Sequence, residues 1–231
     1  MITVVLLSGG LDSSVVLAHA LAKGRDCYAL SFNYSQRHQV ELQSAQTIAE
    51  HYSIPHHTIS ISPETFQQSS LVSKLTLPKN RNLEDISKGG IPNTYVPARN
   101  TLFLAYATSY AELIGAKEIY IGVNAMDKYG YPDCRPKYLA AFQSLLNLAT
   151  QQAIKGNPPC LVTPLVTWDK TAIIEEGKKL NAPMHLSFSC YDPHEKMHCG
   201  QCDACYLRHS GFTNANISDP TQYLNLPIQN I

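Results

Sequence analysis

The feature that most constrains the fold is an alternation, over the first 62 residues, of short apolar runs and stretches with helical spacing. The apolar runs at 2–7, 27–33 and 57–62 are typical of strands. Between them, 12–23 and 40–52 place apolar residues at helical spacing. An order of strand, helix, strand, helix, strand predicts a parallel sheet with right-handed crossovers, and therefore an α/β fold with helices on both faces of the sheet.

The remaining chain continues the alternation less regularly. The sequence predicts a helix over 98–114, a strand over 118–123, a long helix ending near 154 and a helix over 169–180. Residues 77–97 are rich in proline, glycine and polar residues, and a loop of this length is usually a lid or a binding loop.

The chain is expected to have two parts. Residues 1–186 would form the α/β domain described by the alternation, which also holds the candidate nucleotide-binding loop described below. Residues 187–231 would form a cysteine-rich segment with a short helix near 205–212 and a polar tail, which often frays or docks on a partner subunit.

Composition excludes several classes of protein. In 231 residues, 44% are hydrophobic, which is enough for a core and excludes wholesale disorder. The 18 basic and 18 acidic residues cancel, so we expect no direct nucleic-acid partner. No stretch reaches the roughly 18 apolar residues of a membrane span, and the first apolar run is too short for a signal peptide. We therefore expect a cytoplasmic protein with reduced thiols and no membrane partner.

A loop rich in glycine and serine joins the first predicted strand to the first predicted helix. The candidate nucleotide-binding residues are Leu7, Ser8, Gly9, Gly10, Leu11, Asp12, Ser13 and Ser14. Gly9 and Gly10 permit backbone conformations that are closed to other residues, so successive N–H groups can face one anion beside the positive end of the helix dipole. This pattern fits a pyrophosphate, and an ordinary glycine-rich turn with serine caps is the alternative. Neither Gly-x-x-x-x-Gly-Lys nor Gly-x-Gly-x-x-Gly is present.

Asp12 places a negative charge in this candidate phosphate site. A carboxylate beside a polyphosphate makes sense if Mg²⁺ lies between them, because Mg²⁺ prefers oxygen ligands and substrate phosphates. The alternative is that Asp12 complements the positive end of the helix dipole.

Four of the seven cysteines fall within 16 residues. Cys190, Cys199, Cys202 and Cys205 have the spacing C-x8-C-x2-C-x2-C, which matches a structural zinc site of the Cys₄ type. An iron–sulfur cluster also uses four cysteines, so the letters leave the metal open. Four thiolates already fill a tetrahedron, so we expect the nearby histidines not to be ligands.

Several further blocks, together with the loop at 8–14, carry a resemblance to one enzyme family. The blocks are Phe32 to His38 with Glu41, Gly90 to Asn100, Gly130 to Arg135, Thr163 to Leu165 with Lys170, and Ser189 to Tyr191 followed by Cys199 to Cys205 and Arg208. The loop itself resembles the PP-loop of ATP pyrophosphatases, which cleave ATP between the α and β phosphates. Over nearly its whole length the chain is similar to the 7-cyano-7-deazaguanine synthases of queuosine biosynthesis. Ser35 is a departure, because the family usually has glycine there.

The resemblance implies a Rossmann-like fold of the adenine nucleotide alpha hydrolase-like type and an ATP-dependent ligase that forms C–N bonds. Family members convert 7-carboxy-7-deazaguanine and ammonia into the nitrile 7-cyano-7-deazaguanine. The implied route adenylates the carboxylate, lets ammonia form an amide, and activates the amide oxygen with ATP before elimination. The implied cofactors are ATP with Mg²⁺ and one structural Zn²⁺ per chain. We expect free ammonium as the nitrogen source, and a homodimer.

The resemblance also suggests roles for individual residues. Asp12, Arg99 and Lys170 are the candidate catalytic residues, and the two cations would neutralise charge growing on the α-phosphate. The alternative for each cation is a solvated surface position.

Four further residues are candidates for substrate binding. Arg37 and His38 follow the second strand, where open parallel sheets place their ligands. Asp133 would accept hydrogen bonds from the guanine-like N–H edge, and Arg135 would meet the substrate carboxylate. The alternative for Asp133 and Arg135 is a local ion pair in a turn.

Two other functions fit parts of the sequence. A tRNA-thiolating PP-loop enzyme would bind RNA and use catalytic cysteines, but the zero net charge and the lack of a basic arm count against it. A zinc-containing regulator without ATP turnover would leave the loop at 8–14 unexplained.

Overall fold

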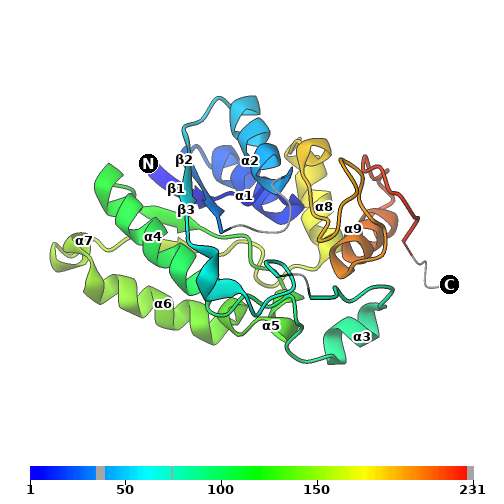
Figure 1. Cartoon of the computed structure of the whole chain (residues 1–231). Helices are drawn as coiled ribbons and strands as arrows, with labels where there is room; N and C mark the ends of the chain where they lie inside the picture. The colour runs from blue at the N-terminus through cyan, green and yellow to red at the C-terminus, as the bar shows by residue number, and fades with distance from the viewer. Residues whose placement is uncertain (35–39, 74, 228–231) are drawn as a thin grey trace.

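A five-stranded parallel sheet forms the centre of the molecule (Figure 1). The computed structural model describes residues 1–34, 40–73 and 75–227. The strand order is β3-β2-β1-β4-β5, and the five strands are β1 (Ile2–Leu6), β2 (Asp26–Asn33), β3 (His56–Ser60), β4 (Glu118–Tyr120) and β5 (Cys160–Val162). The chain runs outward from β1 to β3 and then returns to the other side of β1. The carboxyl ends of β1 and β4 therefore border the topological switch point, where such sheets bind ligands.

Helices connect the strands and cover both faces of the sheet. They are α1 (Leu11–Ala22), α2 (Val40–His51), α3 (Leu83–Lys88), α4 (Arg99–Ile114), α5 (Asp127–Gly130), α6 (Pro136–Ala149), α7 (Gln151–Ile154), α8 (Lys170–Lys179) and α9 (Asp203–Asn214). Three 3₁₀ turns add η1 (Pro63–Phe66), η2 (Pro132–Cys134) and η3 (Met184–Leu186). Within the described ranges, no helix combines the length and the apolar character that a bilayer span requires.

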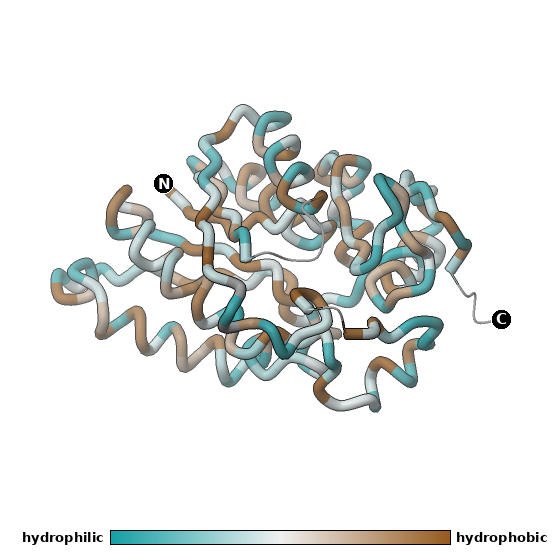
Figure 2. The backbone as a smooth tube through the Cα atoms, viewed as in Figure 1, coloured by the Kyte–Doolittle hydropathy of each residue, from teal (hydrophilic) through white to brown (hydrophobic). Residues whose placement is uncertain are grey.

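Alternating side chains of β1 divide the core between the two faces. Val5 and Leu7 pack with α1, α2 and α8, whereas Val4 and Leu6 pack with α4 and α6. Figure 1 shows these two groups of helices on opposite sides of the strands, and Figure 2 shows hydrophobic stretches running through the central strands. Each fully buried side chain of this kind contributes about 1.5–3 kcal/mol. The predicted sheet with helices on both faces is confirmed.

The structure differs from the predicted elements in three places. The predicted long loop contains α3, whose N-terminus is closed by a capping box between Asn82 and Asp85. The predicted long helix is broken at Thr150, which ends α6 and caps α7. The edge strand β5 was not predicted, because its three residues are too few to show a period.

The cysteine-rich segment packs beside the end of α8. Its helix α9 contacts α8, and Phe212 of α9 enters the core cluster of α1 and α8. The four cysteines form a separate cluster with Phe188. An isolated antiparallel bridge pairs Cys202 with Lys79, so the segment also holds the chain that leads into α3.

Candidate active site

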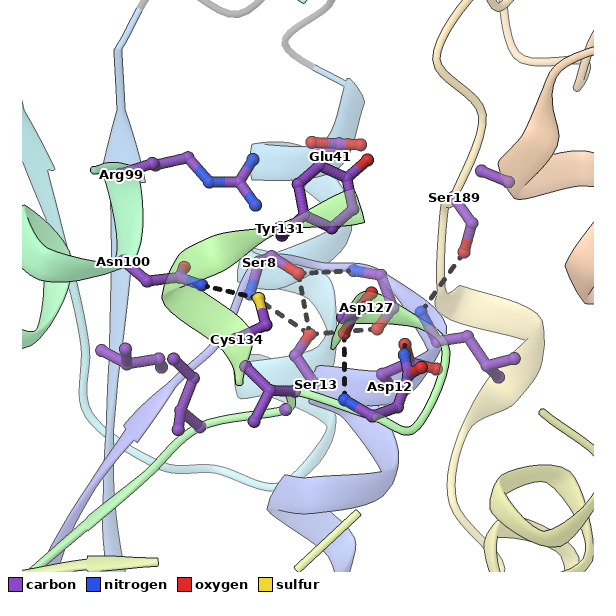
Figure 3. Close-up of a pocket in the computed structure, with 18 of the residues that line it drawn as sticks. Ser8, Asp12, Ser13, Glu41, Arg99, Asn100, Asp127, Tyr131, Cys134 and Ser189 are labelled. Carbon is purple, nitrogen blue, oxygen red and sulfur yellow. Dashed lines mark hydrogen bonds between the residues drawn. The ribbon is translucent and has the colours of Figure 1, made fainter. Parts of the chain in front are cut away.

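The loop at 8–14 leaves β1 and enters α1 with the side chains of Ser8 and Ser13 facing each other. The hydroxyl of Ser13 lies 3.0 Å from the Ser8 hydroxyl, accepts the Ser8 N–H at 3.2 Å, and donates to the Gly10 carbonyl at 3.0 Å. The Ser8 hydroxyl in turn accepts the Gly10 N–H at 3.3 Å. These bonds, drawn in Figure 3, hold the loop in one conformation before any anion arrives.

Gly9 is the residue that lets this loop approach α2. Its φ of +86° lies in the left-handed region, and an added Cβ would lie 2.0 Å from the Glu41 carbonyl oxygen. Gly10 is different, because its φ of −76° is an extended conformation open to any residue. The prediction of two conformationally special glycines therefore holds for Gly9 alone.

Asp12 forms the centre of a charged network at the start of α1. Lys170 Nζ lies 2.6 and 2.8 Å from the two Asp12 carboxylate oxygens, and Asn124 Nδ2 donates to one of them at 2.9 Å. Asp127 accepts the Asn124 backbone N–H at 2.9 Å. Burial, reinforced by the nearby Asp12 charge, raises the pKa of Asp127 to about 6. Two neighbouring carboxylates beside a phosphate loop offer the oxygen ligands that Mg²⁺ prefers.

Arg99 is held by aromatic residues rather than by a carboxylate. It is the first residue of α4 and donates from Nη1 to the Tyr34 hydroxyl at 3.2 Å, while its guanidinium lies 5.7 Å from the Phe103 ring centroid. The preceding residue, Ala98, has a φ of +52°, which turns the chain sharply into the helix. Among the described residues, no carboxylate lies within ion-pair distance of Arg99. It therefore keeps its charge available to an anionic ligand.

These groups surround a cavity of about 290 Å³. Of the predicted residues, those that line it are Leu7, Ser8, Gly10, Leu11, Asp12, Ser13, Arg99 and Lys170. Further parts of the wall come from the carboxyl ends of β2 and β4, from α2, α4 and α9, and from residues within 124–134 and 188–191. Figure 3 shows Glu41, Arg99 and Tyr131 toward one end of the cavity and Asp12, Ser13 and Asp127 toward the other.

Asp133 and Arg135 are absent from the lining of this cavity. Asp133 is buried and accepts the Asn100 N–H at 2.9 Å, so it caps the first turn of α4. Arg135 is exposed, and its Nε donates to the Lys128 carbonyl at 3.2 Å. Direct contact of either residue with a substrate stays a prediction. Arg37 and His38 lie outside the described residues.

The four clustered cysteines converge as a metal site requires. All four thiols are buried, and their sulfur atoms lie within 4.8 Å of one another. Backbone N–H groups of Cys199 and Asp192 donate to Cys190 Sγ at 3.2 and 3.3 Å, and that of Cys202 donates to Cys199 Sγ at 3.4 Å. Such donors stabilise thiolates, so the donor set fits a tetrahedral metal ion.

The cysteine cluster is joined to the phosphate loop through its neighbours. Phe188 donates its N–H to the Gly9 carbonyl at 2.8 Å, and the Ser189 hydroxyl accepts the Leu11 N–H at 3.4 Å. His198 accepts the Ser189 N–H at 3.1 Å through Nε2. The imidazole of His198 is therefore engaged in this connection, and the converging metal ligands among the described residues are the four cysteines.

Comparison with known proteins identifies the family. The family model described as "Queuosine biosynthesis protein QueC" matches residues 2–216. The chain belongs to the QueC family. It is 48% identical over 219 residues to the 7-cyano-7-deazaguanine synthase of Trichodesmium erythraeum, covering 94% of this chain and 98% of the relative. The 7-cyano-7-deazaguanine synthase of Kineococcus radiotolerans is 47% identical over 222 residues, covering 95% of this chain and 96% of the relative.

Solved structures show more distant similarity. An NMN synthetase from Francisella tularensis is 22% identical with a TM-score of 0.48, covering 94% of this chain and 77% of that chain. The U34-tRNA thiolase NcsA from Methanococcus maripaludis is 16% identical with a TM-score of 0.48, covering 84% and 62%. Neither similarity carries a functional conclusion for this QueC-family chain.

Two of the three cysteines outside the cluster, Cys27 and Cys134, are buried and have properties unsuited to nucleophiles. Burial raises the pKa of the Cys134 thiol well above its usual range, and raises that of Cys27 to about 12. Both are therefore protonated near neutral pH, whereas a thiolating enzyme needs a thiolate. Cys134 also lies on the cavity wall, where it accepts a hydrogen bond from Asn100 Nδ2 at 3.1 Å.

Sequence reasoning missed four residues of this QueC-family cavity as site members. Asn124 and Asp127 follow β4, so their position after a strand was an available signal. Ser189 stands directly before the first cysteine of the cluster, and this position was a weaker signal of a site residue. The sequence marks Glu41 only as part of a block, because no spacing rule distinguishes a cavity carboxylate in the first turn of a helix from a solvated one.

Proposed function

We propose that this chain is an ATP-dependent 7-cyano-7-deazaguanine synthase, which converts 7-carboxy-7-deazaguanine and ammonia into the nitrile. The observation that carries the proposal is the loop at Ser8–Ser14, which opens into a cavity lined by three carboxylates, a lysine and two arginines. Family membership adds the identity of the substrate, because the curated relatives are named for this activity. ATP would be cleaved between its α and β phosphates, so that AMP passes to the substrate oxygen.

The loop would hold the β and γ phosphates of ATP. Backbone N–H groups, the hydroxyls of Ser8 and Ser13, and the N-terminus of α1 all favour an anion at this position. Asp12 and Asp127 would hold Mg²⁺, which neutralises phosphate charge when bound.

Lys170 and Arg99 would act on the α-phosphate. Lys170 is anchored by Asp12 and lines the same cavity, and Arg99 approaches from α4. Positive charges fixed before the reaction stabilise the growing negative charge without reorganisation, which is the largest contribution in many phosphoryl-transfer sites. Asp133 supports Arg99 by capping the first turn of α4.

Cys190, Cys199, Cys202 and Cys205 would bind one Zn²⁺. A closed Cys₄ site leaves no open coordination position, so its role would be structural. The bonds from Phe188 and Ser189 to the phosphate loop support this role, because they place the metal-binding segment against the ATP site. The division at residue 187 stays a prediction.

The remaining proposals concern location and assembly. We place the protein in the cytoplasm, where thiols stay reduced, and propose free ammonium as its nitrogen source. We also propose a homodimer, supported by the exposed apolar side chains of Leu113, Leu148 and Ile154, which are 80%, 82% and 84% accessible. Light scattering of the purified protein tests the dimer, and a mass of 25.5 kDa would contradict it.

The main test is turnover of the purified protein. It would be incubated with 7-carboxy-7-deazaguanine, ammonium and Mg-ATP, and the products would be identified by mass spectrometry. We expect the amide and then the nitrile. Failure to form either product would overturn the proposed function.

A further inference from the structure

The Glu41 carboxylate lies on the wall of the cavity. Glu41 stands in the first turn of α2, and its carbonyl is the atom that Gly9 approaches, so it borders the phosphate loop. Within the described parts of the chain, no hydrogen bond or ion pair engages its side chain. The other cavity carboxylates are engaged: Asp12 by Lys170 and Asn124, and Asp127 by the Asn124 N–H.

The surroundings of Glu41 suit a group that exchanges protons near neutral pH. Burial raises the pKa of Glu41 to about 7, and the positive charge of Arg99 opposes part of this rise. The charge that acts on it comes from Arg99 of α4, and Glu41 in turn adds to the rise that burial causes in the pKa of Tyr34, which follows β2. The neighbouring η3 contributes His185, which is exposed to solvent. A general base is most effective when its pKa lies near the operating pH.

The proposed reaction has a step that requires such a base. ATP first adenylylates the amide oxygen, and the nitrogen then loses one of its two protons. The resulting intermediate has a carbon–nitrogen double bond and one remaining N–H. Nitrile formation removes that proton. The N–H electron pair becomes the third carbon–nitrogen bond, and the carbon–oxygen bond breaks with its electron pair leaving on AMP.

We propose that the Glu41 carboxylate accepts this N–H proton as AMP departs, which makes Glu41 the catalytic base of the nitrile-forming half of the reaction. This inference rests on the proposed function. The products of the step are the nitrile, AMP and protonated Glu41, which returns its proton to solvent before the next cycle.

Other cavity groups are poorer acceptors. Burial raises the pKa values of Tyr34, Tyr131 and Cys134, so these groups stay protonated near neutral pH. None of the described cavity-lining residues is a histidine. Arg37 and His38 lie outside the described residues, and the inference uses neither.

The ratio of nitrile to amide is the measurement that tests this role. Glu41→Gln keeps the size of the side chain but removes the base. We expect it to form the amide from 7-carboxy-7-deazaguanine at a rate within a few-fold of the unaltered protein, while the ratio of nitrile to amide falls by about 100-fold or more. With the amide supplied directly together with Mg-ATP, nitrile formation should fall by the same factor. The matched control is Glu50→Gln, an exposed glutamate on the same helix, which should leave the ratio unchanged.

Several outcomes would overturn the assignment. An unchanged ratio of nitrile to amide in Glu41→Gln would overturn it. An equal loss of amide and nitrile would also overturn it, because such a loss indicates a role in binding. Because the ratio is measured on product formed, partial misfolding of the variant does not alter it. Glu41→Asp should recover part of the nitrile. In the unaltered protein the ratio should fall as pH drops through about 7, and this dependence should vanish in Glu41→Gln. Failure of the proposed function is distinct, since the unaltered protein would then form neither product.

Discussion

Ser189, the residue before the first cysteine of the metal-binding cluster, accepts a hydrogen bond from the backbone N–H of Leu11 in the phosphate loop at 3.4 Å. The two residues are 178 positions apart in the chain. The bond fixes one of the N–H groups at the start of α1, which are the groups that receive an anion. Metal binding and ATP binding are therefore expected to be coupled through this contact.

The first prediction concerns this contact. Ser189→Ala removes the acceptor of the Leu11 N–H and should raise the KM for ATP by about 2- to 12-fold, because one hydrogen bond contributes about 0.5–1.5 kcal/mol. Bound zinc should stay at one ion per chain. Steady-state kinetics and metal analysis measure the two effects. Ser144→Ala, an exposed serine on α6, is the control. An unchanged KM for ATP would show that the contact does not organise the loop.

The second prediction concerns Lys170, which neutralises Asp12 and also lowers the pKa of Asp127. Lys170→Met should reduce kcat by about 100-fold or more, because a fixed positive charge is lost from the cavity. It should also move the acid limb of the pH profile to higher pH, since the pKa of Asp127 rises further without the lysine. The pH dependence of kcat/KM measures the shift.

Lys179→Met provides the control for this change. Lys179 is exposed at the end of the same helix and pairs with Glu176, so its replacement should leave the rate and the acid limb in place. An acid limb that stays unmoved in Lys170→Met would contradict the predicted coupling between Lys170 and Asp127.

The third prediction concerns the metal site. Cys202→Ser should lose zinc and lower the Tm by about 10 °C or more, because a structural metal contributes folding free energy directly. Cys160→Ser is the matched control, because Cys160 is an exposed cysteine outside the cluster. Atomic emission for zinc and a thermal melt decide between the outcomes. If Cys202→Ser kept its zinc and an unchanged Tm, the proposed structural role of the metal would be contradicted.

The fourth prediction concerns Arg208, whose side chain is 1% exposed and whose Nε lies 3.1 Å from Asp219 Oδ1. Burial opposes ionisation of Asp219, but Arg208 and the hydrogen bonds from Tyr223 and Thr221 outweigh it and lower the pKa of Asp219. The resulting stabilisation is present above the ordinary carboxyl pKa of about 4 and is lost as pH falls through the lower folded-state value.

Asp219→Asn leaves the Arg208 charge buried and unpaired, so the free energy of unfolding should fall by about 3 kcal/mol at pH 7. The difference from the unaltered protein should shrink at pH 3. Urea unfolding at both pH values measures it, with Asp26→Asn, an exposed residue at the start of β2, as the control. A difference that is the same at both pH values would exclude the ion pair as its cause.

The local pattern of apolar residues was sufficient to predict the helices and strands in which that pattern repeats clearly. β1, α1, β2 and α2 lie within one or two residues of their predicted ranges, because each presents several apolar residues to one face of the sheet. The phosphate loop and the cysteine cluster were predictable for a similar reason. Each is a continuous segment, and its residue types and spacing indicate what it binds: an anion at the loop and a metal ion at the cysteines.

Features that depend on tertiary contacts were not predictable from spacing. Asp133 carries the charge expected of a substrate-binding residue, yet folding places it beneath the first turn of α4 as a cap. Glu41 lies on the cavity wall because α2 packs against Gly9, a contact that no local period reports. Burial in the cavity raises the pKa of Asp127, and so does the nearby charge of Asp12, which is far from it in sequence and near it in the fold.

The cavity is lined by Leu6 at the start of the chain and by Arg208 close to its end. During synthesis, a nascent chain therefore carries a phosphate loop long before it carries the wall formed by residues 188–191. Complete capture of the nucleotide and the flat substrate must wait until nearly all of the chain has emerged from the ribosome. A chain that stopped before residue 188 would keep the loop at 8–14 but lack this wall of the cavity.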